Sequence, residues 1–412
     1  MTLTTTAHQN VRIKTLYRVI DERAGLRRPP LLSVSIHHGV IRRDSVTDDL
    51  PRAEDLSNYK ICNYGDLVLN RMRAFQGATG VSREQGLVSP DYLVLRPNLN
   101  VEARFLHHLF RSTWFIGEMV ARLRGIGSIE QGNVRTPRIN SEDLGDIRIN
   151  LPPLAEQRRI ADFLDAETSR INTSIKAREV QVKLLRERRF AFVRETLRRG
   201  HRSKELQDTP LTWLPACPQD WILSPLKYLV RCLDGRRVPL SAEQRADRRG
   251  PYPYYGASAI VDHVDDYLFN EPLVLLGEDG AQLGNPLYEV ATYVEGPIWV
   301  NNHAHVLRPE KIDGRFLAEI LNVFDREDCM SGATREKITQ DAMGNIMIPL
   351  PPPDEQAEFV TLFDREMIRT RSLRGVLDKQ LELLVERRQA LITAAVTGQI
   401  DVSTASGRGI ED

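Results

Sequence analysis

The sequence of 412 residues lacks several features that would assign it to a class of protein at once. No apolar run approaches the roughly 18–20 residues that a membrane-spanning helix needs. The N-terminal segment has no apolar core of the kind that signal peptides contain. The four cysteines, Cys62, Cys217, Cys232 and Cys329, are scattered and form no CxxC motif or Cys/His cluster. These absences predict a cytoplasmic protein with reduced cysteines and no zinc site.

The chain also lacks a net charge, because 56 basic residues balance 56 acidic ones. This balance argues against a protein that coats nucleic acid regardless of sequence, but it leaves room for a DNA reader with local basic faces. Residues 176–205 hold eleven Lys and Arg against four Glu. Such runs are most often solvated helix faces, so this one alone predicts no binding site.

No catalytic motif is recognisable in the sequence, which has no phosphate-binding loop, nucleophile elbow or metal-spaced His pair. Asn285-Pro-Leu-Tyr288 resembles the Asn-Pro-Pro-Tyr loop of adenine methyltransferases, but leucine replaces the second proline and no Gly-rich turn precedes it. Gly277-Glu-Asp-Gly280 is more simply a tight acidic turn than a metal site. The sequence therefore favours a protein that is not an enzyme. An enzyme that acts on DNA through an unrecognised site remains an alternative.

What the sequence does contain is one segment that occurs twice. Residues 149–199 and 348–398 align without a gap at an offset of 199 residues, and 16 of 51 positions are identical. The offset is close to half the chain, so the repeat predicts two units in tandem. A duplicated frame around different intervening sequences predicts a pseudo-two-fold molecule with two non-equivalent faces.

Each copy of the repeat has the pattern of one long helix. A proline stop opens each copy, acidic residues follow it, and more than 40 residues without proline come next. Apolar residues three, four or seven apart form a near-heptad stripe, which predicts an antiparallel coiled-coil pair. Two separate helices, each packed on its own domain, are the alternative. The residues expected at the helix-pair or partner interface are Glu156, Gln157, Leu164, Leu184, Leu185, Glu355, Gln356, Phe363, Leu383 and Leu384.

The segments between the long helices read as α+β domains, with short strand-like runs and helical patterns at residues 105–123 and 315–324. Both end alike, so they are expected to be divergent copies. The predicted organisation is a globular domain at 1–150, a long helix at 151–204, a second globular domain at 205–349, a second long helix at 350–402 and a flexible tail at 403–412.

Both globular segments hold residues suited to recognition by hydrogen bonds. Arginine suits guanine and Asn or Gln suits adenine in the major groove, although the same residues equally suit carbohydrate or protein. Residues 299–305 alternate as one strand would, which predicts Asn301, His303 and His305 on an outward face. The alternative is that these side chains satisfy each other and the 278–280 turn. The candidate DNA-binding residues are Arg71, Arg73, Gln76, Ser89, Asp91, Tyr92, Arg135, Arg138, Arg236, Arg237, Tyr254, Tyr255, Asn301, Asn302, His303, His305, Arg335 and Lys337.

The duplicated, proline-stopped helix with Glu-Gln at its start, alternating with two variable domains, resembles the specificity subunit of type I restriction–modification systems. Val88-Ser-Pro-Asp-Tyr92, Val300-Asn-Asn-His303 and the closing residues 391–398 are similar to stretches of that family. The resemblance implies two target-recognition domains that read a bipartite, asymmetric site in double-stranded DNA. It also implies that the paired helices dock two adenine methyltransferase subunits, and restriction subunits through them.

The resemblance further implies that the chain is non-catalytic and holds no cofactor. S-adenosylmethionine, ATP and magnesium would then belong to the partner subunits. A protein-binding scaffold built on the coiled coil alone is the remaining alternative.

Overall fold

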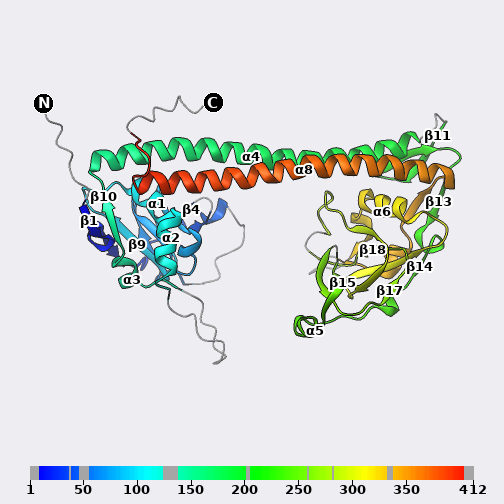
Figure 1. The fold of residues 1–412 in the computed structure, drawn as a ribbon, viewed down its shortest axis with the longest axis horizontal. Helices are drawn as coiled ribbons and strands as arrows, with labels where there is room; N and C mark the ends of the chain where they lie inside the picture. Colours follow the sequence, from blue (N-terminus) through cyan, green and yellow to red (C-terminus); the bar gives the residue numbers. More distant parts are fainter. Residues whose placement is uncertain are drawn as a thin grey trace. The chain divides into compact units, whose positions relative to one another are not determined.

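The computed structural model describes residues 9–36, 39–45, 55–123, 138–200, 205–257, 259–280, 283–331 and 337–402 (Figure 1). It divides into two compact units, unit 1 with residues 1–177 and 380–412 and unit 2 with residues 178–379. The division runs through both long helices, α4 (Leu154–Arg199) and α8 (Pro353–Val396). No helix in the described parts of the chain is long and apolar enough to cross a membrane.

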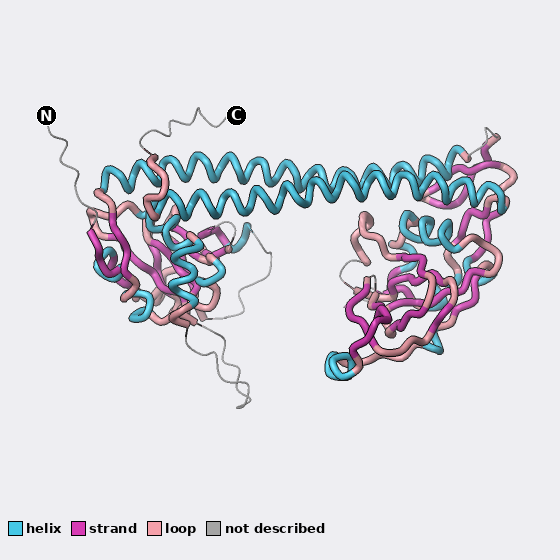
Figure 2. The backbone as a smooth tube through the Cα atoms, viewed as in Figure 1, coloured by secondary structure: helices cyan, strands magenta, loops and turns pink. Residues whose placement is uncertain are grey.

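Unit 1 combines short strands and helices with one end of each long helix (Figure 2). Its strands are β1 (Gln9–Arg12), β2 (Tyr17–Ile20), β3 (Leu32–Ser35), β4 (Gly39–Arg42), β5 (Lys60–Cys62), β6 (Leu67–Asn70), β7 (Thr79–Val81), β8 (Gly86–Val88), β9 (Tyr92–Pro97) and β10 (Arg148–Leu151). Its short α-helices are α1 (Ala103–Arg111), α2 (Thr113–Val120) and α3 (Ser141–Gly145), and its 3-10 turns are η1 (Ile13–Leu16), η2 (Arg43–Ser45) and η3 (Ala74–Gln76).

Unit 2 has the same mixed character. Its strands are β11 (Leu206–Leu211), β12 (Leu214–Pro218), β13 (Ile222–Pro225), β14 (Val230–Cys232), β15 (Arg249–Tyr255), β16 (Ile260–Val264), β17 (Phe269–Asn270), β18 (Leu273–Gly277), β19 (Ala291–Val294), β20 (Pro297–Val300), β21 (Ala304–Pro309), β22 (Met330–Ser331), β23 (Lys337–Ile338) and β24 (Met347–Leu350). Its short α-helices are α5 (Ala242–Asp247), α6 (Gly314–Val323) and α7 (Gln340–Gly344), and its 3-10 turns are η5 (Leu226–Tyr228), η6 (Asp234–Arg236) and η7 (Glu327–Cys329).

The two units share one arrangement of strands, which we call their frame. A four-stranded sheet has the order β2-β9-β6-β7 in unit 1 and β14-β21-β18-β19 in unit 2. A strand pair precedes each long helix: β1 with β10 before α4, and β13 with β24 before α8. Ile13 donates its backbone amide to Ile147, and Leu226 does so to Ile346, at 2.8 and 2.9 Å. The globular segments are therefore divergent copies of one fold.

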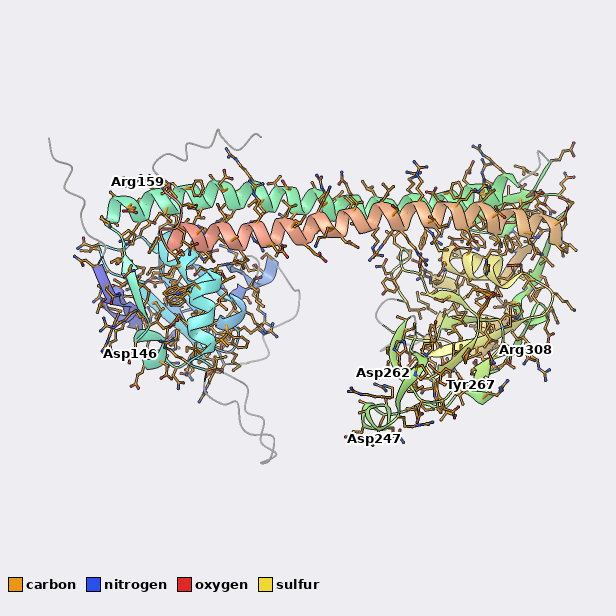
Figure 3. All side chains as sticks on the ribbon, viewed as in Figure 1. Asp146, Arg159, Asp247, Asp262, Tyr267 and Arg308 are labelled. Atoms are coloured by element: carbon orange, nitrogen blue, oxygen red, sulfur yellow. The ribbon has the colours of Figure 1, made fainter. Side chains whose placement is uncertain are left out.

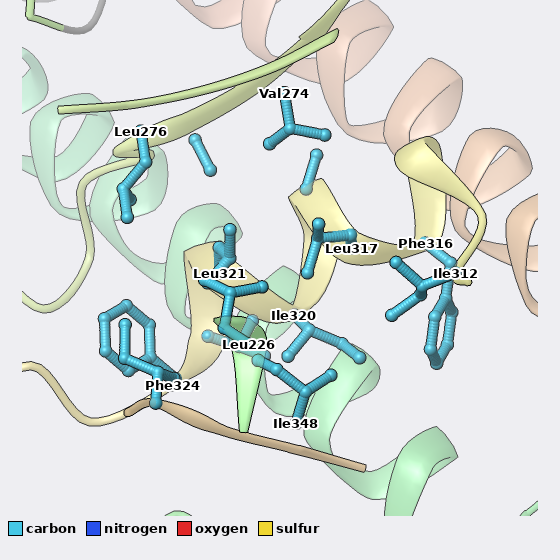
Figure 4. Close-up of a cluster of buried hydrophobic side chains, with 14 of the residues drawn as sticks. Leu226, Val274, Leu276, Ile312, Phe316, Leu317, Ile320, Leu321, Phe324 and Ile348 are labelled. Atoms are coloured by element: carbon cyan, nitrogen blue, oxygen red, sulfur yellow. The ribbon is translucent and has the colours of Figure 1, made fainter. Parts of the chain in front are cut away.

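Each core joins the sheet to the long helices. In unit 2, the buried residues of α6 pack with Phe359 and Phe363 of α8 and with Val193 of α4. Figure 4 shows part of this cluster, with Leu317 and Leu321 of α6 on the side of Val274 and Leu276 of β18, and Phe316 beside Ile312. In unit 1, Ile160 and Leu164 of α4 pack with Ile392 of α8. In both units the apolar stripe of a long helix is thus buried against its own sheet domain as well as against the other helix.

The contacts between α4 and α8 are also found inside each unit. Asn172 accepts a 2.6 Å hydrogen bond from Arg388 in unit 1, and Arg188 lies 3.4 Å from Glu366 in unit 2. In each unit, the N-terminal end of one long helix therefore meets the C-terminal end of the other.

The predicted interface residues on the long helices differ in burial. Gln157, Leu164, Glu355, Gln356 and Phe363 are buried, and Glu156, Leu185 and Leu384 are intermediate. Leu184 and Leu383 stay 54% and 51% exposed, so neither is buried within its own unit, and their place at a partner interface stays a prediction. The cause of this exposure is that the stripe passes through Leu185 and Leu384, each one residue further along its helix.

The helix expected at 105–123 is two helices, because Ser112 leaves the helical conformation and accepts a 3.2 Å hydrogen bond from the amide of Phe115. It thereby caps α2 at its N-terminus. The tail at 403–412 lies outside the described residues.

Candidate nucleic-acid interface

In unit 1, a tight turn between β6 and β7 presents several of the predicted residues. The side-chain oxygen of Asn70 accepts the amide of Met72 at 3.1 Å, which closes an Asx turn. Gly77 ends η3 with a φ of 85°, a value that glycine adopts without strain. Arg73 and Gln76 are exposed on this turn. The turn therefore directs a guanidinium and an amide, both suited to base edges, into solvent.

Tyr92 lies beside this turn. Its hydroxyl accepts a 3.4 Å hydrogen bond from the side-chain amide of Asn70. Burial raises the pKa of that hydroxyl, and the nearby charge of Arg73 offsets part of the effect. Ser89 accepts the amide of Asp91, which is exposed. The structure thus brings Tyr92 and Arg73 together, although 19 positions separate them in the sequence.

Arg71 has a different environment from its neighbours. Its guanidinium donates to the backbone oxygen of Ile139 at 3.3 Å and to the side chain of Asn140 at 3.4 Å. The backbone oxygen of Arg71 accepts the amide of Ile139. Arg71 therefore holds the segment that follows Arg138, which is exposed. Arg135 and Arg335, also predicted to contact DNA, lie outside the described residues.

In unit 2, a buried network of charges joins η6, the turn after β18, β21 and β23. Asp234 accepts His305 Nδ1 at 2.6 Å and the amide of Val306 at 2.8 Å. His305 Nε2 lies 2.9 Å from the backbone oxygen of Ile338, so both ring nitrogens face oxygen atoms. Burial alone would raise the pKa of Asp234, but the bonds from His305 and Val306 outweigh it and lower that pKa.

Glu278 is the second carboxylate of this network. It accepts Arg237 at 2.7 Å and also pairs with Lys337. Arg237 donates in addition to the backbone oxygen of Ala304 at 2.7 Å. Burial opposes ionisation of Glu278, and the hydrogen bonds from Lys337 and Arg237 still lower its pKa. Arg237 is thus engaged within the fold, whereas Lys337 keeps 48% of its side chain exposed.

The network is also the one group of three possible metal ligands in the described parts of the chain. Asp234, Glu278 and His305 bring one ligand atom each to within 4.8 Å of one another. However, Arg237 and Lys337 already neutralise Glu278, and His305 bonds Asp234. A cation would have to displace these contacts, so the donor set fits an ion-pair network better than a metal site.

The prediction of one continuous strand at residues 299–305 is wrong. Strand β20 ends at Val300 and β21 begins at Ala304, with a turn between them. Asn301 accepts the amide of His303 at 2.8 Å, and Asp279 contacts His303 Nδ1 at 3.0 Å. The 278–280 turn therefore satisfies these polar residues, which is the alternative that the sequence left open. Asn301 and His305 are buried, so they do not form an outward face with His303, which is 41% exposed.

The remaining predicted residues of unit 2 divide between core and surface. Tyr254 is buried, and its hydroxyl accepts the amide of Leu240 at 2.9 Å. Tyr255 is half-buried beside it on β15. Arg236 is exposed, lies 4.7 Å from the ring of Phe269 and donates to the backbone oxygen of Leu268. Asn302 is exposed in the turn before β21. The burial of Tyr254 and His305 places them under the surface, where they support the exposed residues.

Sequence reasoning missed one exposed edge of unit 2. Arg245 of α5 donates to Asp262 of β16 at 3.0 Å, and Figure 3 shows Asp262 and Asp247 at this edge. Tyr267 is 41% exposed there and meets Tyr252 with ring centroids 5.2 Å apart. No spacing in the sequence links α5, β15 and the loop that carries Tyr267, so only the fold reveals this edge.

Comparison with models of known protein families shows which family this chain belongs to. The sequence model for the type I restriction modification DNA specificity domain matches residues 52–184 and 218–378, which is more than half of the chain. The chain belongs to this family. It is thus a type I restriction–modification specificity subunit, and DNA target recognition is the role of its family.

Two relatives extend this comparison along the chain. A type I restriction enzyme specificity subunit of Methanocaldococcus jannaschii, MjaX, is 23% identical over 380 residues, which cover 86% of this chain and 82% of the relative. A specificity subunit of Haemophilus influenzae, S.HindORF215P, is 36% identical over 142 residues, which cover 34% of this chain and 36% of the relative. The latter alignment thus spans about a third of each protein.

A solved structure supports the fold. This chain is similar to one determined in work on complex assembly and conformational transition of the type I R-M system, with a TM-score of 0.65. The two are 19% identical, and the alignment covers 96% of this chain and 99% of the other. At this identity, the likeness supports the fold alone.

Proposed function

We propose that this chain is the non-catalytic subunit that selects the DNA sequence for a type I restriction–modification complex. Residues 1–150 and 205–349 act as two target-recognition domains, each reading one half of a bipartite, asymmetric site. The observation that carries the proposal is one shared frame with two different sets of exposed polar residues. Unit 1 presents Arg73, Gln76, Asp91 and Arg138, and unit 2 presents Arg236, Asn302, Lys337 and the partly exposed His303.

The frame explains how different loops are held in the same way. In unit 1, Gln157 accepts the backbone amide of Glu102 at 2.9 Å, and Glu102 is the cap of α1. In unit 2, Gln356 accepts the amide of Asp313, which is the cap of α6. The same contact fixes each domain to its long helix, so loops can differ while their support stays constant. This suits two readers of different sequences.

We further propose that α4 and α8 form an antiparallel coiled-coil pair, and that its length fixes the unread gap between the half-sites. Two near-equivalent repeat surfaces suit two identical methyltransferase subunits, through which restriction subunits join. Methylation requires the target adenine to leave the base stack, and that chemistry belongs to the partner. S-adenosylmethionine, ATP and magnesium accordingly bind in the partner subunits. Such a complex acts on DNA in the cytoplasm.

Exchange of one domain tests the proposal. Residues 1–150 are replaced by the corresponding residues of a relative, and the chain is assembled with its methyltransferase partner. Sequencing of methylated adenines should show one altered half-site, while the other half-site and the gap stay the same. The reciprocal exchange of residues 205–349 should alter the other half. Alteration of both halves by one exchange would contradict independent reading by the two domains.

Two further assays test the alternatives, one on the isolated chain and one on the assembled complex. The isolated chain, incubated with S-adenosylmethionine and adenine-containing DNA, should transfer no methyl group. Turnover by the isolated chain would instead indicate an enzyme. A chain that assembles with its partners but gives no DNA-dependent gel shift would indicate a scaffold.

A further inference from the structure

A cleft of about 700 Å³ lies within unit 1, between α1, the β4–β7 region and the unit 1 ends of α4 and α8. Its described lining holds five Lys and Arg residues against two carboxylates, Glu102 and Asp165. Both carboxylates are already engaged: Arg104 lies 3.0 Å from each, and His108 lies 2.8 Å from Asp165. The lining therefore keeps an excess of positive charge in a recessed space.

Arg388 is a cation of this cleft whose burial is not compensated by a carboxylate in the described part of the chain. It is half-buried and donates a 2.6 Å hydrogen bond to the neutral side chain of Asn172. Among the described residues it forms no ion pair, and burial lowers its pKa. Removing a guanidinium from water without a counter-ion is costly, so a negatively charged ligand at this position would be favoured.

The second repeat shows what a compensated arginine looks like. Arg189 occupies the position equivalent to Arg388, since 199 residues separate them. In unit 2, Arg189 lies 2.6 Å from Glu319 and 2.7 Å from Glu289. Glu319 is six residues after the α6 cap, Asp313, and the residue six positions after the α1 cap, Glu102, is His108. The carboxylate that neutralises the arginine in unit 2 is thus replaced in unit 1.

Unsatisfied polar atoms mark the same cleft. His107 Nδ1 and Gln389 Oε1 are buried without a hydrogen-bond partner, and both side chains line the cleft. Burial, together with the charges of His108 and Arg111, lowers the pKa of His107 well below its usual value. Burial and the charge of Arg388 also lower the pKa of Arg111, to about 10. Buried polar atoms of this kind are normally satisfied by a bound molecule or water.

We propose that this cleft binds a phosphate group, with Arg388 as its principal contact. Guanidinium groups match the oxygen atoms of phosphate with two parallel hydrogen bonds, and Arg111 and Lys176 line the same space. The cleft is large enough for a nucleotide as well as for free phosphate. The phosphate comes either from such a small molecule or from the DNA backbone, and competition separates the two sources. The site is independent of base reading and does not rest on the proposed function.

Isothermal titration of the full-length chain with inorganic phosphate at low ionic strength tests the site. Wild type should bind, and Arg388→Gln should weaken binding roughly tenfold or more, because a charge-assisted hydrogen bond is lost. Arg387→Gln is the matched control, since this exposed neighbour does not line the cleft and should leave the affinity unchanged.

Asn172→Asp provides the test that does not remove the arginine. It places a carboxylate at the atom that Arg388 already contacts, and so reproduces the compensation seen at Arg189. Phosphate affinity should fall by a similar factor while the thermal midpoint stays the same or rises. Wild-type chain that binds no phosphate at millimolar concentration, or Asn172→Asp chain that binds like wild type, would overturn the proposal. If wild-type chain binds phosphate as expected, competition by ATP or by a short duplex identifies the source of the phosphate.

Discussion

The side-chain oxygen of Gln356 accepts a 2.7 Å hydrogen bond from the backbone amide of Asp313, the residue that caps α6. The side-chain nitrogen of Gln356 donates to the backbone oxygen of Pro351 at 2.8 Å. One buried amide therefore ties the start of α8, the proline stop and the start of α6 together. Gln157 does the same in unit 1 with Glu102 and Pro152.

Replacement of Gln356 by Ala is expected to destabilise unit 2 by about 1–3 kcal/mol, because two buried backbone groups lose their partner. Thermal or urea unfolding of the full chain measures the loss. Gln219→Ala is the control, because that side chain is exposed and should change stability little. Equal stability of the two variants would show that Gln356 does not hold the frame.

Part of this frame follows from local sequence. The proline stops, the acidic first turns and the long proline-free stripes each act within a few residues, so they predict both long helices well. The importance of Gln157 and Gln356 was also indicated by the repeat. Their partners were not, because Glu102 and Asp313 lie 55 and 43 residues away and are reached only through the fold.

The sequence predictions that were wrong have the same cause, which is contacts between residues far apart in the sequence. Residues 299–305 alternate like one strand, yet a backbone bond from Glu278 to His303 and the cap from Asn301 turn the chain there. Burial of Tyr254 and His305 follows from contacts with Leu240 and Asp234, which sequence spacing does not encode. Composition thus identified segments suited to recognition, but the fold decides which of their side chains meet solvent.

The buried pair of Asp234 and His305 makes the stability of unit 2 depend on pH. The pKa of Asp234 is lowered in the folded state, so its contribution is present above the usual pKa of about 4 and is lost as the pH falls through the lowered value. Asp234→Asn is expected to be less stable than wild type at pH 7 by about 1–3 kcal/mol. This difference should narrow as the pH falls below about 4.

Urea unfolding across pH 3 to 7 checks this expectation. Asp247→Asn, at the exposed end of α5, should follow the wild-type profile. A difference between wild type and Asp234→Asn that stays constant with pH would show that the charge of Asp234 does not contribute.

The exposed leucines of the long helices are expected to serve assembly rather than folding. Leu184→Asp should change the free energy of unfolding by no more than about 0.5 kcal/mol, because the side chain is 54% exposed. Leu164→Asp should unfold unit 1, because that side chain is buried in the core. If methyltransferase subunits dock on the repeats, Leu184→Asp should weaken their binding.

Size-exclusion chromatography and titration of the chain with the methyltransferase measure this effect. Leu99→Asp is the matched control, because Leu99 is 99% exposed and lies outside the long helices. Unchanged assembly of the Leu184→Asp chain would remove Leu184 from the docking surface.

Arg73 and Arg71 are two residues apart in one turn, but we expect their replacement by alanine to have different effects. Arg73 is exposed, so Arg73→Ala should leave folding unchanged and relax the preference at one base pair by about 1–3 kcal/mol. Arg71 holds Ile139 and Asn140, so Arg71→Ala should lower the thermal midpoint of the chain.

Sequencing of adenines methylated by the assembled complex measures the change in base preference, and calorimetry measures the change in thermal midpoint. Arg18→Ala, exposed on β2, is the control for loss of charge alone. If Arg73→Ala weakens binding equally at all sequences, Arg73 contacts phosphate and not a base, because phosphate contacts carry no sequence information.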